Sequence, residues 1–77
     1  MDKDKRIQLM LGKMLKGRRI RKGFSQRGFA KHAGLDRSYY AKIENGGADV
    51  SFSTLRRISK GLRMNMYVLV KRVEKQI

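Results

Sequence analysis

The feature that most constrains the fold of this chain is a pair of short helical segments separated by Gly34. Each segment follows a side chain that favours a helix N-cap, Ser25 before the first and Asp36 before the second. Gly34 can adopt the positive φ that a sharp turn between helices requires, and Ala30 is small enough to let two steeply crossed helices approach closely. The inward apolar positions are Phe29, Ala33, Leu35, Tyr40 and Ile43. This spacing predicts a helix-turn-helix with helices over residues 26–33 and 37–45.

Two further segments show helical periodicity. Apolar residues recur at i, i+3, i+4, i+7 and i+8 in Ile7, Met10, Leu11, Met14 and Leu15, which predicts an amphipathic helix. The next position of this stripe holds Arg18, so the stripe ends there, but we expect the helix to continue to Lys22 with Gly23 as a left-handed C-cap. A fourth helix is predicted after Ser51, and its buried face would be formed by Phe52, Leu55, Ile58 and Leu62.

The C-terminal tail is ambiguous between a strand and a helix. Residues 66–70 are rich in β-branched and aromatic side chains and contain neither Pro nor Gly, which favours a strand. The same tail also fits a helical stripe formed by Met66, Leu69, Val70, Val73 and Ile77. We expect one mainly α domain over residues 1–77. Within it, residues 1–6 are predicted to be disordered and residues 64–77 to form a dimerisation tail, with a strand favoured over a fifth helix.

Charge indicates the class of partner. The chain has 20 Lys and Arg residues against six Asp and Glu, a formal net charge of +14. No acidic residue lies between Asp4 and Asp36, whereas that interval holds ten basic ones. Such a charge attracts polyanions, and merely solvated surfaces usually mix both signs, so nucleic acid is favoured over a membrane. The exposed side of the helix at residues 37–45 offers hydrogen-bond donors for base edges in the major groove: Arg37, Ser38, Tyr39 and Lys42.

Several function classes lack support in the sequence. Cys is absent, and we find no paired carboxylates, phosphate-binding loop or metal motif, so we expect no enzyme, catalytic residue, cofactor or metal. The lone His32 is expected at the surface or core edge, and the methionines at 10, 14, 64 and 66 in the core or a dimer interface. The N-terminus lacks the apolar core of a signal peptide, and the longest apolar run, Met66 to Val70, is too short to span a membrane. These features predict a cytoplasmic protein that binds no membrane.

The chain resembles the Xre family of helix-turn-helix regulators, which includes the phage lambda and Cro-type repressors. The similarity extends from about Leu11 to Leu62 and rests on five stretches: Leu11-Gly12-Lys13, Lys22-Gly23-Phe24-Ser25-Gln26, Ala33-Gly34-Leu35, Ile43-Glu44-Asn45-Gly46 and Ser51-Phe52-Ser53-Thr54-Leu55. It implies four helices plus a tail, or five helices, with the third helix in the major groove. The chain departs from the family pattern at Arg18, Gly28, Tyr40 and Arg63, the last of which replaces a frequent Gly.

The resemblance also implies roles for individual residues. Arg37 and Ser38 match positions that contact base edges, whereas Gln26 and Asn45 match positions that commonly contact phosphate. The base-contacting candidates are Arg37, Ser38, Tyr39 and Lys42. The phosphate-binding candidates are Gln26, Arg27, Lys22 and Asn45. Because a guanidinium can donate two parallel hydrogen bonds to guanine, Arg37 is the first candidate for a bidentate base contact.

Two subfamilies remain possible. Residues 35–39 are similar to restriction–modification controller proteins, whose tail is a dimerising helix, whereas residues 62–70 are similar to HipB-type antitoxins, whose tail is a strand paired with a second copy. Either tail implies a homodimer, which would bind a near-palindromic operator as a repressor or autoregulator. The antitoxin alternative adds a protein toxin as a possible partner. The high net charge leaves non-specific nucleic-acid packaging as a weaker alternative.

Overall fold

Helices account for most of the structure, a computed structural model that describes residues 2–77. Over that range the chain forms α1 (Lys3–Arg21), α2 (Gln26–Ala33), α3 (Arg37–Glu44), α4 (Phe52–Gly61) and α5 (Met66–Lys75). The prediction of a mainly α helix-turn-helix bundle is therefore confirmed, and α2 and α3 occupy the two segments on which it was based.

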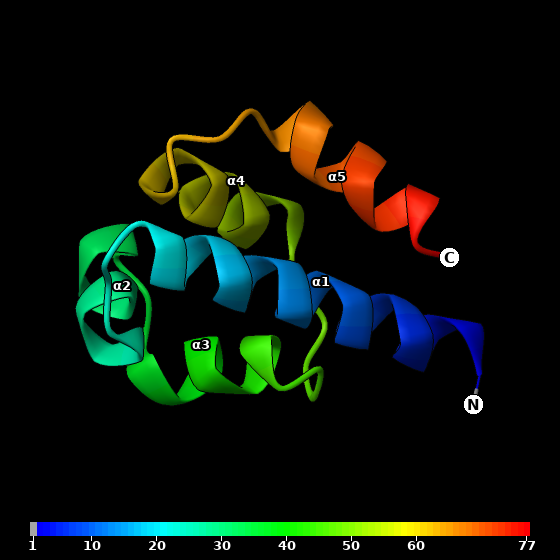
Figure 1. The fold of residues 1–77 in the computed structure, drawn as a ribbon. Helices are drawn as coiled ribbons and strands as arrows, with labels where there is room; N and C mark the ends of the chain where they lie inside the picture. The colour runs from blue at the N-terminus through cyan, green and yellow to red at the C-terminus, as the bar shows by residue number, and fades with distance from the viewer. Residues whose placement is uncertain (1) are drawn as a thin grey trace.

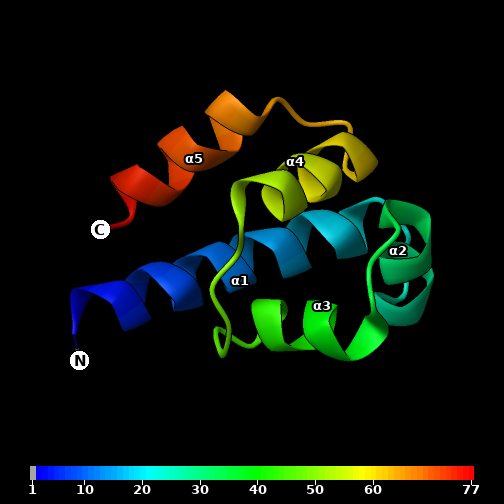
Figure 2. The same ribbon diagram turned by 180° about the vertical axis from the view of Figure 1, so that it is seen from behind.

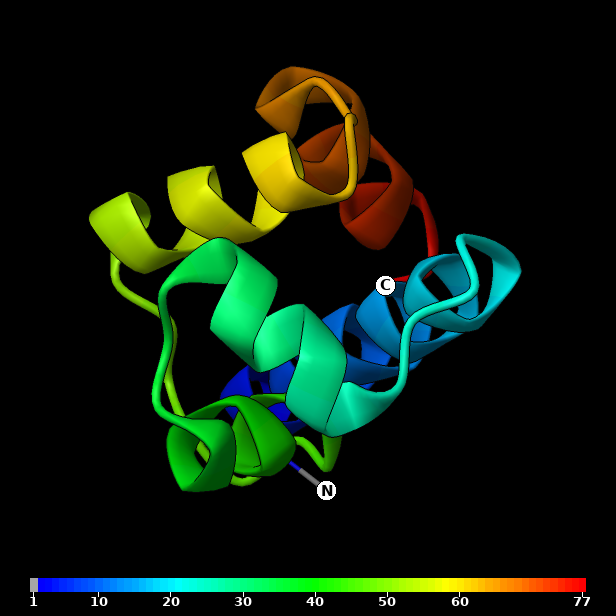
Figure 3. The same ribbon diagram turned by 90° about the vertical axis from the view of Figure 1, so that its left-hand side faces the viewer.

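The central element of the bundle is α1. The α3 helix packs against one side of α1, and α4 and α5 lie on the other, as two opposite views show (Figure 1, Figure 2). The α2 helix lies at the end of α1 that is remote from both chain termini. It contacts both α3 and α4, and Figure 3 shows it between these two helices. The outward face of α3 is therefore remote from α5.

Side-chain caps and one left-handed glycine fix the ends of α2, α3 and α4. The Ser25 hydroxyl accepts a hydrogen bond from Gly28 N at 2.9 Å, the Asp36 carboxylate accepts one from Tyr39 N at 3.0 Å, and Ser51 Oγ accepts one from Thr54 N at 3.1 Å. Gly34 has φ 72°, as the turn between α2 and α3 requires. Among residues 2–77, Arg63 is the non-glycine residue with a positive φ, 53°, a conformation that Gly adopts with less strain.

The core lies where the helices α1 to α5 meet. Its fully buried side chains are Leu15, Phe29, Ala30, Tyr40, Ile43, Ile58, Leu62 and Leu69. The prediction that Phe52 lies on the buried face of the fourth helix is wrong, because its side chain is 73% exposed. Phe52 is the first residue of α4, whereas the buried residues of this helix, Ile58 and Ser59, lie in its C-terminal half, which is the part that packs on the core.

The strand that we favoured for the tail is also wrong, because residues 66–75 form α5. Asn65 caps this helix by accepting a hydrogen bond from Tyr67 N at 2.8 Å, and Leu69 and Val73 are buried at helical spacing. A helix satisfies its backbone hydrogen bonds within its own segment, whereas a lone strand needs a partner. Burial of the helical stripe therefore outweighs the β-propensity of the side chains.

The N-terminus differs from the expected disorder. The Asp2 carboxylate accepts a hydrogen bond from Lys5 N at 2.8 Å and so caps α1, which begins at Lys3. Residues 3–6 are helical rather than disordered because a capping side chain precedes them. The segment predicted to be disordered also includes Met1, which lies outside the described residues.

Candidate nucleic-acid interface

The outward face of α3 carries most of the predicted base-contacting residues. Arg37 and Ser38 are exposed at the first turn, and Lys42 is exposed one turn further along. The same helix buries Tyr40 and Ile43 on its opposite side, which holds this face outward. The structure therefore brings Arg37, Ser38 and Lys42 together on one cationic helix face.

Tyr39 lies at the border of this face. Its ring is half-buried against the core, and its hydroxyl donates a hydrogen bond to the Asp49 carbonyl oxygen at 3.1 Å. This contact fixes the ring on the segment that leads into α4. The phenolic oxygen has used its donor but can still accept a hydrogen bond. Tyr39 thus differs from its exposed neighbours, because it offers an acceptor from a fixed position.

The predicted phosphate-binding residues surround the start of α2 and the end of α3. Gln26 is the first residue of α2 and is half-buried, and the next residue, Arg27, is exposed. Lys22 is the C-cap of α1, Asn45 is the C-cap of α3, and both are exposed. These four residues come from three helices, so only the tertiary fold can bring them to one surface.

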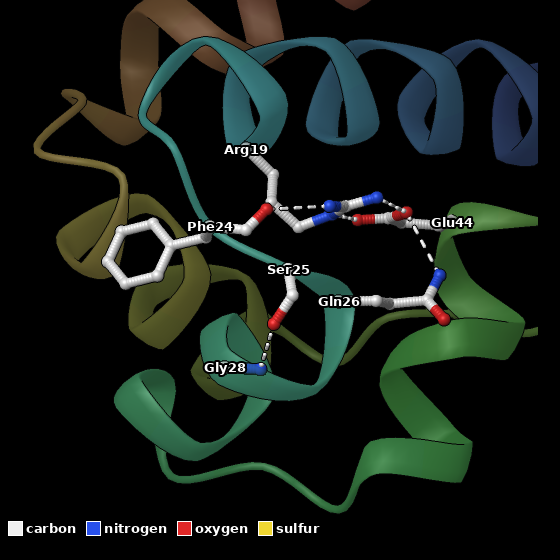
Figure 4. Close-up of polar contacts among 6 residues, drawn as sticks. All are labelled: Arg19, Phe24, Ser25, Gln26, Gly28 and Glu44. Carbon is white, nitrogen blue, oxygen red and sulfur yellow. Dashed lines mark hydrogen bonds and ion pairs between the residues drawn. The ribbon is translucent and has the colours of Figure 1, made fainter.

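A buried ion pair connects those three helices (Figure 4). Arg19 of α1 donates hydrogen bonds from Nε and Nη2 to the two carboxylate oxygens of Glu44 on α3, at 2.6 and 3.0 Å. Arg19 Nη1 donates to the Phe24 carbonyl oxygen at 2.8 Å, and Gln26 Nε2 donates to Glu44 Oε1 at 3.1 Å. The side chains of Arg19 and Glu44 are only 9% and 1% exposed. The pair therefore fixes the amide of Gln26 relative to the end of α3.

The charge of Glu44 is retained despite its burial. Burial by itself would raise the pKa of this carboxyl, but the hydrogen bonds and positive charge of Arg19 lower it below its ordinary value of 4.5. Burial raises the pKa of the neighbouring Tyr40, whose hydroxyl has no hydrogen-bond partner within residues 2–77. Because Glu44 is paired with Arg19, its charge is compensated inside the protein, whereas Asp36, which caps α3, is exposed.

Sequence analysis missed this ion pair, although a signal was present. Arg19 follows Leu15 by four residues on the inward stripe of α1, and Glu44 follows Tyr40 by four on the inward stripe of α3. Two opposite charges at inward stripe positions predict a buried pair, since an unpaired buried charge is costly. The charge pattern alone assigns Arg19 to the basic surface, because it is one of the ten basic residues between Asp4 and Asp36.

The described chain offers little for other kinds of site. Within residues 2–77, no helix is long and apolar enough to cross a membrane. The same residues contain no group of three or more side chains suited to holding a metal ion. His32 is exposed, and its ring stacks on Phe24 with the ring centroids 4.9 Å apart, which agrees with the expected place at the core edge.

The α3 helix has an exposed cationic face and is joined to α2 through the turn at Gly34. This arrangement defines a DNA-binding domain of the helix-turn-helix class. The chain belongs to the helix-turn-helix family, whose model matches residues 15–69. This match confirms the resemblance to Xre-type regulators.

Known relatives point to one of the two subfamilies. The control protein C.MunI from a Mycoplasma species is 41% identical over 71 residues, which are 91% of this chain and 96% of that protein. The structure of the restriction–modification controller C.AhdI from Aeromonas hydrophila is similar, with a TM-score of 0.78, 32% identity and coverage of 80% of this chain and 94% of that one. The controller C.Esp1396I, solved as a tetramer with its natural 35-base-pair operator, has a TM-score of 0.79, 28% identity and coverage of 90% and 91%. These relatives are controllers, not antitoxins.

Proposed function

We propose that this protein is a restriction–modification controller that binds a near-palindromic operator as a homodimer. The observation that carries the proposal is the exposed α3 face formed by Arg37, Ser38 and Lys42, in a chain whose relatives are controllers. The strand that motivated a toxin partner is replaced by α5, so that argument for an antitoxin no longer holds. Protein recovered from its native host should contain no stoichiometric second protein, and a bound toxin would contradict the proposal.

We assign contacts by chemistry and position. Arg37 would donate two hydrogen bonds to guanine O6 and N7, Ser38 and Lys42 would contact neighbouring base edges, and Tyr39 would accept a hydrogen bond from an exocyclic amine. One Nε2 hydrogen of Gln26 is held by Glu44, which leaves the other to donate to a phosphate at the N-terminus of α2. The remaining phosphate contacts are assigned to Lys22, Arg27 and Asn45.

Site selection from random double-stranded DNA tests this function. We expect enrichment of two related half-sites whose centres lie about 34 Å apart, since a two-fold symmetric dimer places two recognition helices one helical turn apart. Affinity should fall steeply with salt, with a log–log slope of roughly −0.9 per neutralised phosphate. Equal binding to selected and random DNA would instead support non-specific packaging.

Replacing Arg37 with Ala should change sequence preference. We expect a loss of about 1–3 kcal/mol in binding free energy on the selected site, with relaxed preference at one position of each half-site. Lys22→Ala is the matched control, because loss of a phosphate contact should weaken all sequences equally and reduce the salt slope by about 1. Titrations of both variants against the selected site and its single-base variants measure this. A uniform loss for Arg37→Ala would contradict the base contact.

An apolar patch on the side of α4 and α5 supports the dimer. We define the patch as Phe52, Met66, Tyr67 and Val70; Phe52, Tyr67 and Val70 are 73, 69 and 45% exposed. Phe52 and Met66 line one hollow between the starts of α4 and α5. A single domain rarely leaves large apolar side chains clustered in solvent. We therefore place the dimer interface here, in part on the expected tail at residues 64–77.

Phe52→Ser should separate dimerisation from folding. Because Phe52 is 73% exposed, the variant should keep its helical content and melting temperature at concentrations where it is monomeric. Sedimentation equilibrium should show a dimer dissociation constant that is higher by about tenfold or more, as expected for loss of a central aromatic interface residue. Ile20→Ser is the matched control, because Ile20 is an exposed apolar residue of α1 outside the patch, at 56%. Equal effects of both changes would place the interface elsewhere.

A further inference from the structure

A second concave site lies between α1 and α5, on the side of α1 opposite the DNA-binding helix. It is a cavity of about 420 Å³, within the range of about 300–1,000 Å³ typical of small-molecule pockets. Its apolar lining comes from Met10 and Met14 of α1, from Leu69 of α5, and from Met64 before α5. No residue of α2 or α3 lines it, and Figures 1 and 2 show α5 beside α1 with α3 on the far side. The cavity is therefore separate from the DNA interface.

Four cations surround this apolar lining. Lys13, Arg18 and Arg21 come from α1 and Arg72 comes from α5, and none of the residues that line the cavity is acidic. The guanidinium of Arg21 folds over Gly17, because Nη1 would lie 3.5 Å from a Cβ built on that glycine. Four like charges around one cavity repel one another, and an anion placed among them would lower that repulsion.

Arg18 is the residue that most clearly points to a ligand. It occupies the position that follows the apolar stripe of α1 on the same helix face. Its side chain is half-buried, and Nε is buried with no hydrogen-bond partner within residues 2–77. A buried guanidinium N–H without an acceptor costs free energy, and a ligand oxygen would satisfy it. Arg18 is not among the residues to which we assign DNA contacts.

We infer that the cavity between α1 and α5 binds a small organic anion, with a carboxylate or phosphate head held by Arg18, Arg21 and Arg72 and a short apolar body placed against Met10, Met14 and Met64. The apolar lining of the cavity would contact the apolar body of the ligand, and the cationic side chains around it would bind the anionic head. The cavity is also distinct from the apolar patch, because Arg72 and Val70 lie on opposite flanks of α5 at 100° per residue. The ligand would thus contact α1 and α5 without covering either the DNA-binding face or the patch.

The methionine methyl groups provide a direct test with the full chain. We use octanoate and octyl phosphate as probes, with octylamine, acetate and inorganic phosphate as comparisons, and follow methyl resonances of ¹³C-methionine-labelled protein. Saturable shifts are expected for Met10, Met14 and Met64 with both anionic octyl probes, and little change for Met66, which does not line the cavity. The head groups alone should produce no saturable shift of these methyls, and octylamine should bind at least about tenfold more weakly, since it lacks the favourable charge.

Three variants make the result specific. Arg18→Gln should weaken octanoate binding by about tenfold or more, the effect of losing a charge-assisted hydrogen bond. Lys16→Gln removes the same charge from an exposed position of α1 that does not line the cavity, and should change affinity by less than about threefold. Gly17→Leu should fill the cavity and abolish binding, and its circular dichroism spectrum reports whether it folds.

Several outcomes would overturn the inference. Equal binding of octylamine and octanoate would mean simple apolar partition, and equal losses in Arg18→Gln and Lys16→Gln would mean diffuse attraction to a basic protein. Shifts at Met66 as large as those at Met14 would place the probe elsewhere. No saturable shift with either anionic probe would exclude the site. If Gly17→Leu fails to fold, the octanoate affinities of Arg18→Gln and Lys16→Gln still test whether the probe binds in the cavity.

Discussion

Replacing Glu44 with Gln should destabilise this protein by about 3–5 kcal/mol, the usual effect of removing one partner of a buried ion pair. The loss is large because the substitution leaves the Arg19 guanidinium, whose side chain is 9% exposed, without a counter-charge. A domain of this length has a total stability of roughly 4–12 kcal/mol at 0.05–0.15 kcal/mol per residue. Urea unfolding followed by circular dichroism measures the change. Glu74→Gln, which alters an exposed carboxylate of α5, is the matched control and should change stability by less than about 0.5 kcal/mol.

The same ion pair predicts how stability depends on pH. Arg19 lowers the pKa of Glu44 in the folded state below its ordinary value of 4.5. The contribution of the pair is therefore fully present above about pH 4.5 and is lost as pH falls through the lower, folded-state pKa. Glu44→Gln should remove this part of the acid-induced loss. If the variant keeps the full acid sensitivity of the parent, Glu44 is not the group responsible.

A double replacement tests whether the pair serves stability or position. Arg19→Met combined with Glu44→Leu removes both charges and should recover most of the stability lost in Glu44→Gln, because apolar residues of similar volume often replace a buried pair without penalty. The Gln26 amide would then lack the Glu44 oxygen that holds it at 3.1 Å. DNA affinity should fall for all sequences alike. Unchanged affinity in a stable double variant would contradict a positioning role.

Local signals in the sequence predicted the part of the fold that forms the DNA interface. The caps at Ser25 and Asp36 and the positive φ at Gly34 depend on residues within one turn of chain, and all three are present in the structure. Local chemistry therefore suffices to place α2 and α3 and to identify their exposed face. The exposed positions of Arg37 and Lys42 follow from the same helical periodicity.

Features that depend on long-range packing were predicted less well. The tail has strand-forming side chains, and only the fit of Leu69 and Val73 against the rest of the bundle decides in favour of a helix. Phe52 begins a helix whose apolar stripe is clear, but its own direction depends on how that helix lies on the core. The helical stripes place Arg19 and Glu44 on inward faces, but the two residues are 25 positions apart, so only the packing of α1 against α3 shows that they are partners.

Gly12→Ala should destabilise the protein by about 2–4 kcal/mol, which is the second largest effect that we expect. A Cβ at this position would lie 2.7 Å from the Ile43 carbonyl oxygen and closer still to that of Glu44. Both atoms are backbone atoms of α3, so neither can move aside as a flexible side chain would. The glycine therefore sets how closely α1 approaches the helix that carries the DNA-contacting face.

Gly17→Ala is the matched control in the same helix. A Cβ there would meet only the end of the Arg21 side chain, at 3.5 Å, so the higher helix propensity of Ala should stabilise the protein by about 0.5–1 kcal/mol. Urea midpoints should thus move in opposite directions for two identical changes five residues apart. Similar midpoints for both variants would show that helix propensity, not contact with α3, explains Gly12. If Gly12→Ala also weakens DNA binding under conditions where it is fully folded, the approach of α1 to α3 positions the interface as well as stabilising the fold.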